Sequence, residues 1–317
     1  MKHKLLIVVP CYNEEEVLPS TIPCLREVVA SMVEKQLISA DSGIVFIDDG
    51  SLDKTWEILK DAAEKPGVTG IHLAGNVGHQ NALMAGLEYA KDHCDLCVSI
   101  DADLQDDVAA IEEMVQKYLD GADIVFGVRN DRTSDTTFKR VTAQGFYKFM
   151  HALGVNTVYN HADFRLMSRA ALEALSEYRE SHLFLRGIIA DMGFQTDVVY
   201  YARKERMAGK SKYPLKKMLS FAWNGITSFS AKPISVLMFF GLFVSFCAVA
   251  AFVYSLISRF MGNVISGWTS LMISVWFLGG IQVFSIGLIG QYIGKTYMES
   301  KHRPRYHIKE IVSKDKE

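Results

Sequence analysis

The chain has 317 residues, a formal net charge of −2 and 49% hydrophobic residues. This length holds one large domain or two ordinary ones. The charge is uneven, because residues 1–233 carry six more acidic than basic side chains while residues 234–317 carry four more basic than acidic ones. A net acidic main region argues against nucleic-acid binding, which requires a basic surface.

Apolar runs and amphipathic stretches alternate along the first 128 residues. The apolar runs predict strands, and the stretches between them predict helices. The predicted strands cover residues 4–9, 43–47, 68–73, 96–100 and 123–128. The predicted helices cover residues 17–35, 54–65, 80–91 and 108–119. This order is typical of βαβ units and predicts an α/β domain built on a parallel sheet.

Polar motifs follow the first two predicted strands. Pro10, Tyr12 and Glu14 come after the first strand, and Asp48 and Asp49 come after the second. Open α/β sheets bind their ligands outside the carboxyl ends of the strands. There, an aromatic ring and a carboxylate can form the wall and the hydrogen-bond acceptor for a nucleotide base. Each motif alone is more often a turn or a helix cap, so the inference depends on their recurrence at successive strand ends.

Residues 100–107, Ile-Asp-Ala-Asp-Leu-Gln-Asp-Asp, follow the fourth predicted strand. Asp101 and Asp103 there make a hard-oxygen site that suits Mg²⁺ or Mn²⁺. Such a cation usually neutralises a diphosphate. The alternative is an acidic, solvated loop in which Asp106 or Asp107 caps the next helix.

Two long stretches near the C-terminus, residues 234–257 and 264–294, contain no charged residue. Each is longer than the roughly 20 residues that a helix needs to cross a membrane, so we predict two spans. The alternative is a pair of buried helices in a soluble core. Basic residues precede the first stretch and follow the second, while the connecting loop holds only Arg259. The positive-inside rule therefore places both termini and the main domain in the cytoplasm.

Seven basic residues and one acidic residue occupy residues 203–217, directly before an amphipathic stretch. This pattern predicts an interfacial helix beside a lipid headgroup. The alternative for the basic cluster is non-specific attraction to anionic lipid, and the alternative for the amphipathic stretch is an ordinary core-packing helix. The predicted regions are a catalytic domain over residues 1–213, the interfacial helix over 214–232, two transmembrane helices over 233–294, and a cytosolic basic tail over 295–317.

Five motifs occur in an order that resembles one known family. They are Val-Val-Pro-Cys-Tyr-Asn-Glu-Glu (8–15), Asp-Asp-Gly-Ser (48–51), Asp-Ala-Asp-Leu-Gln-Asp (101–106), Ala-Asp-Phe-Arg-Leu-Met (162–167) and Arg-x-x-Gly-x-Ser-Lys-Tyr (206–213). Together with the paired C-terminal spans they resemble glycosyltransferase family 2, in its polyprenyl-phosphate branch. That branch includes dolichyl-phosphate mannosyltransferases and bacterial undecaprenyl-phosphate glucosyltransferases. The resemblance implies a GT-A fold, with a Rossmann-like, mixed and mainly parallel sheet.

The resemblance also implies roles for individual residues. The metal and diphosphate ligands would be Asp101, Asp103 and Gln105. The nucleotide contacts would be Pro10, Tyr12, Glu14 and Asp49. The groups that grip the phosphates of donor and lipid would be Arg129, Arg140, Arg206, Ser211 and Lys212. Asp163 and Arg165 match the motif beside the sugar and the acceptor, and Asp163 and Asp103 are the catalytic candidates.

One loop departs from the family pattern. Relatives commonly read Arg-Asn-x-Gly-Lys where this chain has Gly75-Asn76-Val77-Gly78-His79, so two cations are missing or replaced by a histidine. The Q-x-x-R-W motif of processive polysaccharide synthases is absent from the sequence, which favours the addition of a single sugar.

We therefore expect a membrane-bound inverting glycosyltransferase that uses Mg²⁺ or Mn²⁺. It would move one hexose from a nucleotide sugar, UDP-glucose or UDP-N-acetylglucosamine, to undecaprenyl or another polyprenyl phosphate. The alternatives are direct glycosylation of a lipid such as diacylglycerol, and a catalytically silent membrane scaffold. Glycines spaced along the second predicted span would permit close helix packing and hence a homo-oligomer.

Overall fold

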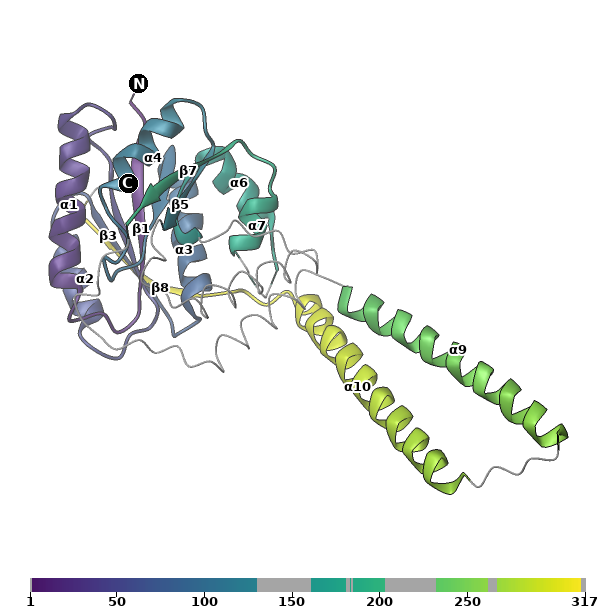
Figure 1. The fold of residues 1–317 in the computed structure, drawn as a ribbon. Helices are drawn as coiled ribbons and strands as arrows, with labels where there is room; N and C mark the ends of the chain where they lie inside the picture. The colour runs from purple at the N-terminus through teal and green to yellow at the C-terminus, as the bar shows by residue number, and fades with distance from the viewer. Residues whose placement is uncertain are drawn as a thin grey trace. The chain divides into compact units, whose positions relative to one another are not determined.

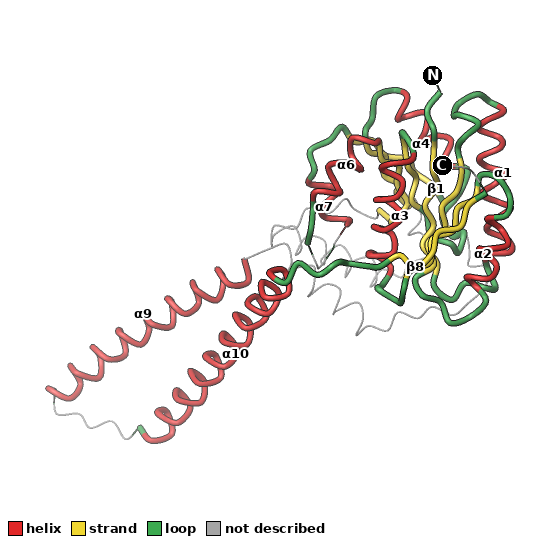
Figure 2. Tube along the Cα trace, turned by 180° about the vertical axis from the view of Figure 1, so that it is seen from behind, coloured by secondary structure: helices red, strands yellow, loops and turns green. Residues whose placement is uncertain are grey.

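The computed structural model of the protein describes residues 2–129, 161–180, 183, 185–202, 232–261 and 267–314. Eight strands of the described chain form one sheet, with helices on both faces (Figures 1 and 2). The strands are β1 (Leu5–Cys11), β2 (Gly43–Asp48), β3 (Val68–Leu73), β4 (Leu96–Ser99), β5 (Ile124–Arg129), β6 (His161–Ser168), β7 (Thr196–Tyr201) and β8 (Ile308–Ser313). The helices packed with the sheet are α1 (Leu18–Glu34), α2 (Thr55–Ala63), α3 (His79–His93), α4 (Ala110–Leu119), α6 (Arg169–Glu177) and α7 (Leu185–Asp191).

The strand order in the sheet is β7-β5-β6-β4-β1-β2-β3-β8. Strands β4, β1, β2 and β3 run parallel to their neighbours in this group, and β5 runs parallel to β7. Strand β6 is antiparallel to both β4 and β5, and β8 is antiparallel to β3. The sheet is therefore mixed and mainly parallel, as predicted. The nine elements predicted in the first 128 residues are confirmed, each with bounds within two residues of the expected ones.

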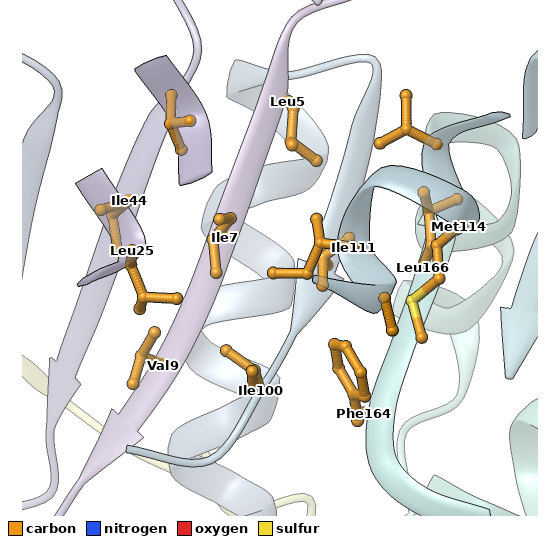
Figure 3. Close-up of a cluster of buried hydrophobic side chains, with 14 of the residues drawn as sticks. Leu5, Ile7, Val9, Leu25, Ile44, Ile100, Ile111, Met114, Phe164 and Leu166 are labelled. Atoms are coloured by element: carbon orange, nitrogen blue, oxygen red, sulfur yellow. The ribbon is translucent and has the colours of Figure 1, made fainter. Parts of the chain in front are cut away.

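The two faces of β1 explain how the layers assemble. Leu5, Ile7 and Val9 point to the face that is covered by α1 and α4, where they meet Leu25 and Ile111 (Figure 3). All five side chains are fully buried. Alternate residues of a strand point to opposite faces, so an all-apolar strand such as β1 must be covered on both sides. Helix α3 provides the second cover.

Helix α3 packs on the sheet through a glycine. A Cβ atom at Gly86 would lie 2.4 Å from Cγ1 of Val8 and 2.5 Å from Cδ1 of Ile47. Only a residue without a side chain lets the helix approach the strands this closely. The position of α3 matters because its first residue, His79, lies at the carboxyl edge of the sheet.

Strands β6, β7 and β8 were not predicted as secondary structure. Strand β6 holds Asp163 and Arg165 within a run that is otherwise mostly apolar, and both side chains are buried. It pairs with β4 through the register of Ser99 with Arg165. The motif at residues 162–167 is therefore a strand inserted between two parallel ones, and this brings its charges beside the acidic residues that follow β4.

The C-terminal segment also differs from expectation. Residues 295–317 were predicted to form a basic tail, whereas Ile308–Ser313 forms strand β8 and pairs with β3 at the sheet edge. The chain divides into two compact units, and the segment from Arg303 onward belongs to the unit that contains the sheet.

The other unit contains α9 (Lys232–Phe260) and α10 (Trp268–Ser300). Both helices lie on the apolar stretches of the sequence. Among the described residues, one stretch, Phe277–Ser300, is long and apolar enough to cross a membrane, with a mean hydropathy of 1.4. A hairpin of two membrane spans stays a prediction.

We expect Gly86→Ala to destabilise the domain. Overpacking of a tight core costs about 1–3 kcal/mol, which outweighs the gain of about 1 kcal/mol in helix propensity. The melting temperature of the purified chain should fall, while Asp61→Ala on the exposed side of α2 should leave it nearly unchanged. Equal melting temperatures for the two variants would contradict the close packing of α3.

Candidate active site

The turn after β2 is bound to the loop after β3. Asp49 accepts hydrogen bonds from the backbone N–H groups of Val77 and Gly78, at 2.7 and 3.0 Å. Gly50 has a φ of 63°, and a Cβ there would lie 2.6 Å from the carbonyl carbon of Gly75. Asp49, a predicted nucleotide contact, is only 3% exposed. Its carboxylate therefore fixes the loop that borders the site.

Burial raises the pKa of Asp49, and the two N–H donors oppose that shift.

The turn after β1 is tied to the same region. The N–H of Asn13 donates to Oγ of Ser51 at 3.0 Å, and the N–H of Leu52 donates to Oδ1 of Asn13 at 2.9 Å. Asn13 takes a left-handed φ of 54° to make these contacts. The neighbouring Tyr12 is 43% exposed, whereas Pro10 is buried in β1. Of these predicted nucleotide contacts, Tyr12 thus offers an accessible ring at this edge.

The carboxylates after β4 form the acidic side of the site. The side chain of Asp101 is 39% exposed, yet protein atoms crowd it closely. That desolvation raises the pKa of Asp101 to about 6, an effect that His79 opposes and that Asp163 and two further aspartates reinforce. Mutual repulsion of this kind is a common feature of functional sites.

The backbone after Asp101 is strained. Leu104 adopts a left-handed φ of 50°, a conformation that non-glycine residues rarely hold unless the surroundings enforce it. The bend lets the N–H of Gln105 donate to Oδ1 of Asp103 at 3.2 Å. The Gln105 side chain, a predicted metal ligand, is buried.

The acidic pair fits a divalent cation that is coordinated partly by the protein and partly by a substrate. Within the described residues, no group of three His, Cys, Asp or Glu side chains is arranged to hold a metal ion. Mg²⁺, however, is usually held by one or two carboxylates together with phosphate oxygens and water. Asp101 and Asp103 match that smaller donor set, and a cation would offset the negative charge of Asp101, whose pKa is raised by burial and further by the neighbouring aspartates.

His79 links the two sides of the site. Its Nε2 atom lies 3.7 Å from Oδ1 of Asp101 and 3.5 Å from Oδ2 of Asp163. Burial alone would lower the pKa of His79, but the two carboxylates raise it. Gly78, directly before it, donates its N–H to Asp49. One short segment therefore joins the turn after β2 to the carboxylates after β4 and on β6.

Asp163 lies among three cationic or polar partners. Arg165 approaches its Oδ1 atom with Nη2 at 2.5 Å. Arg186 of α7 makes a bidentate contact, with Nε 3.1 Å from Oδ1 and Nη2 3.0 Å from Oδ2. Burial would raise the pKa of Asp163, but the charges of Arg186 and Arg165 and the hydrogen bond from His79 hold it well below its usual range.

A catalytic carboxylate at the position of Asp163 can act as a general base or as a positioning group. A general base works best when its pKa lies near the operating pH. A carboxylate whose pKa is strongly lowered accepts a proton poorly, so the geometry favours a positioning and electrostatic role for Asp163.

Arg165 is an unusual buried cation. It is 1% exposed, and its Nε and Nη1 atoms have no hydrogen-bond partner among the described residues. Buried donors without partners are rare and costly, and they concentrate where function demands them.

Arg129, predicted to grip phosphate, is engaged inside the domain. Its Nη2 atom lies 2.8 Å from Oδ1 of Asp106, and the hydroxyl of Tyr201 donates to the same oxygen at 2.6 Å. This buried cluster joins β5 and β7 to the loop after β4. Through its ion pair with Asp106, Arg129 thus fixes the acidic loop that follows β4. The other predicted phosphate contacts, Arg140, Arg206, Ser211 and Lys212, and the predicted interfacial helix lie outside the described residues.

Sequence reasoning missed Arg186. Its signal is a single arginine within the apolar run Leu-Arg-Gly-Ile-Ile-Ala, but nothing in the sequence pairs it with Asp163. The departure at Gly75 has no steric cause, because a Cβ there would meet no atom within 4 Å.

The family model for glycosyl transferase family 2 matches residues 6–176. The chain belongs to this family. It is 53% identical over 305 residues to the uncharacterized glycosyltransferase YkoT of Bacillus subtilis (strain 168), with 96% of this chain and 90% of the relative covered. It is 41% identical over 309 residues to the bactoprenol glucosyl transferase of Shigella phage SfV, with 96% and 98% covered.

A solved structure, glucosyl-3-phosphoglycerate synthase from Mycobacterium tuberculosis, shows 15% identity and a TM-score of 0.44, with 71% of this chain and 78% of that chain covered. The mixed α/β sheet and the family membership together make this a glycosyltransferase with a GT-A-like fold.

We expect Arg186→Lys to reduce glycosyl transfer about 10–100-fold, because an ammonium group cannot reproduce the bidentate contact with Asp163. Arg169→Lys changes an exposed arginine of α6 and serves as the matched control. Transfer rates for the two variants should differ while their melting temperatures agree. Full activity in Arg186→Lys would show that glycosyl transfer does not need the bidentate contact between Arg186 and Asp163.

Proposed function

We propose that this protein transfers glucose from UDP-glucose to undecaprenyl phosphate, the bactoprenol carrier, at the cytoplasmic face of a membrane. The observation that carries the proposal is that two carboxylates, Asp101 and Asp103, lie at the same edge of the sheet as Asp163. Ion pairs with Arg165 and Arg186 hold Asp163 in place. The relative from Shigella phage SfV is named a bactoprenol glucosyl transferase, which supports glucose as the sugar and a polyprenyl phosphate as the acceptor.

The donor half of the site would hold the nucleotide sugar. The exposed ring of Tyr12 and the turn fixed by Asp49 would border the nucleotide. Asp101 and Asp103 would hold Mg²⁺ or Mn²⁺, which, when bound, would offset the charge of the diphosphate and stabilise it as a leaving group. His79, between Asp101 and Asp163, stands where a donor would meet an acceptor.

The acceptor supplies its own nucleophile. A monoalkyl phosphate has a second pKa of about 6 and is mostly a dianion at neutral pH, so no strong base is required. Its oxygen would attack the anomeric carbon, and the bond from that carbon to the UDP oxygen would break with its electron pair leaving on UDP. A single displacement of this kind inverts the anomeric carbon. Asp163, held by Arg165 and Arg186, would orient the sugar.

The membrane part of the proposal depends on the apolar C-terminal region. Phe277–Ser300 satisfies the length and composition of a membrane span, and α9 covers the other uncharged stretch. We propose that both helices cross the membrane, with both termini and the catalytic domain in the cytoplasm. The lysine-rich segments on either side of the helices support that orientation.

Radiolabelled sugar transfer tests the proposal directly. The full chain in detergent, incubated with UDP-[¹⁴C]glucose, Mg²⁺ and undecaprenyl phosphate, should give an organic-soluble product whose sugar is released by mild acid. A product stable to mild acid and formed with diacylglycerol instead would favour direct glycolipid synthesis. Incorporation from UDP-N-acetylglucosamine but not from UDP-glucose would show that the transferred sugar is N-acetylglucosamine and not glucose.

Asp101→Asn and Asp103→Asn should each lower transfer by at least about 100-fold, since they remove charge that would hold the cation. Asp61→Asn, which changes an exposed aspartate of α2, should behave like the unaltered chain. A chelator should stop transfer, and added Mn²⁺ should restore it. Undiminished activity in the chelator would exclude the metal role.

A further inference from the structure

The segment of residues 305–313, here called the C-terminal strap, completes the sheet next to the donor side of the site (Figure 2). Its strand β8 pairs with β3 along Thr69–Leu73, and Glu310 lies opposite His72. Gly70 lets the strap pack closely, because a Cβ there would lie 3.0 Å from Val312. The pairing is thus part of the packed domain, although β8 lies within residues 295–317, which were predicted to be a basic tail.

Two side chains fasten the start of the strap. The hydroxyl of Tyr306 donates to Oε2 of Glu88 on α3, and Nη1 of Arg305 lies 3.5 Å from Oε1 of the same carboxylate. Arg305 also donates through Nη2 to the carbonyl oxygen of Tyr178, directly after α6. The Arg305 side chain is 12% exposed. The strap therefore holds α3 and the end of α6 together.

The strap also reaches the loop that Asp49 binds. The N–H of Ala74 donates to the carbonyl oxygen of His307 at 2.8 Å. Ala74 begins the loop whose N–H groups, at Val77 and Gly78, donate to Asp49. The same loop ends at His79, the first residue of α3. The loop is thus held at one end by the strap and at the other by a helix that the strap contacts.

A second route leads from β8 to the turn after β2. His72, opposite Glu310, lies with Nδ1 2.6 Å from Oδ2 of the fully buried Asp48. The other oxygen of Asp48 accepts from the N–H of Ser51 at 3.3 Å. The His72 ring stacks on Trp56 with ring centroids 4.7 Å apart. β8 therefore pairs with β3. Through His72, β3 contacts the turn after β2, and its carboxyl end leads into the loop of residues 74–78.

We propose that the C-terminal strap is a positioning element of the nucleotide site, with Arg305 and Tyr306 as its positioning residues. By fixing the start of the loop of residues 74–78 and the middle of α3 at Glu88, the strap sets the affinity for the nucleotide without touching the reacting atoms. This inference rests on the proposed function only in taking the ligand to be a uridine nucleotide.

The test releases the strap from its two helices and measures UDP binding. In the full chain, the double variant Arg305→Met/Tyr306→Phe removes the contacts with Glu88 and Tyr178. The dissociation constant for UDP, measured by calorimetry, and the KM for UDP-glucose should both rise at least about fivefold. The kcat at saturating donor should stay within about twofold, because no group that contacts the transition state is changed. Amide exchange at Ala74 should accelerate.

The matched control removes the same groups elsewhere in the domain. Arg169 donates to a backbone carbonyl at Lys91, and the Tyr118 hydroxyl lies 3.5 Å from His3. The variant Arg169→Met/Tyr118→Phe should bind UDP like the unaltered chain. If the strap variant fails to fold, Tyr306→Phe alone should show the same change to a smaller extent.

The outcomes separate the two proposals. UDP affinity equal to that of the control, or a fall in kcat with unchanged KM, would overturn the role of the strap. UDP binding by the unaltered chain without glucosyl transfer to undecaprenyl phosphate would overturn the proposed function and leave the strap proposal standing. A failure of the unaltered chain to bind UDP would overturn both.

Discussion

The site depends on how the fold accommodates too many carboxylates at one edge of the sheet. Asp101, Asp103 and Asp163 face the same region, and like charges held close together in a protein destabilise it unless cations offset them. The chain offsets one of the three completely, because Arg165 and Arg186 clamp Asp163. It leaves Asp101 only partly compensated, by His79 at 3.7 Å. That residual repulsion is what a metal-bound diphosphate would relieve.

The parts of the fold that the sequence predicted well are those with a single strong signal. The first four strands are short, mostly apolar and buried, and acidic motifs follow β1, β2 and β4, so the ends of these strands and the position of the site follow from pattern alone. The strand β6 escaped because Asp163 and Arg165 interrupt its apolar pattern. Those charges are tolerated inside the sheet because each offsets the other, a fact that no local pattern encodes.

The sequence also did not predict which distant residues and strands contact each other. Arg186 approaches Asp163 from a helix 23 residues further along the chain, and β8 reaches β3 from the far end of the chain, with Ser313 lying 244 positions after Thr69. The resemblance to a family implied which motif residues matter, but it did not show that Arg129 would pair with Asp106 or that Asp49 would bind a backbone loop. Such assignments need three-dimensional contacts, because the same residue types could equally contact substrate.

In the proposed mechanism, Asp101 and Asp103 hold a divalent cation together with the diphosphate of the donor. Anomalous diffraction from crystals of the full chain grown with UDP and Mn²⁺ measures this most directly. We expect one manganese peak at the carboxylates of Asp101 and Asp103, with the UDP phosphates beside it and the uridine near Tyr12. UDP bound without manganese at these carboxylates, or manganese bound elsewhere in the domain, would contradict it.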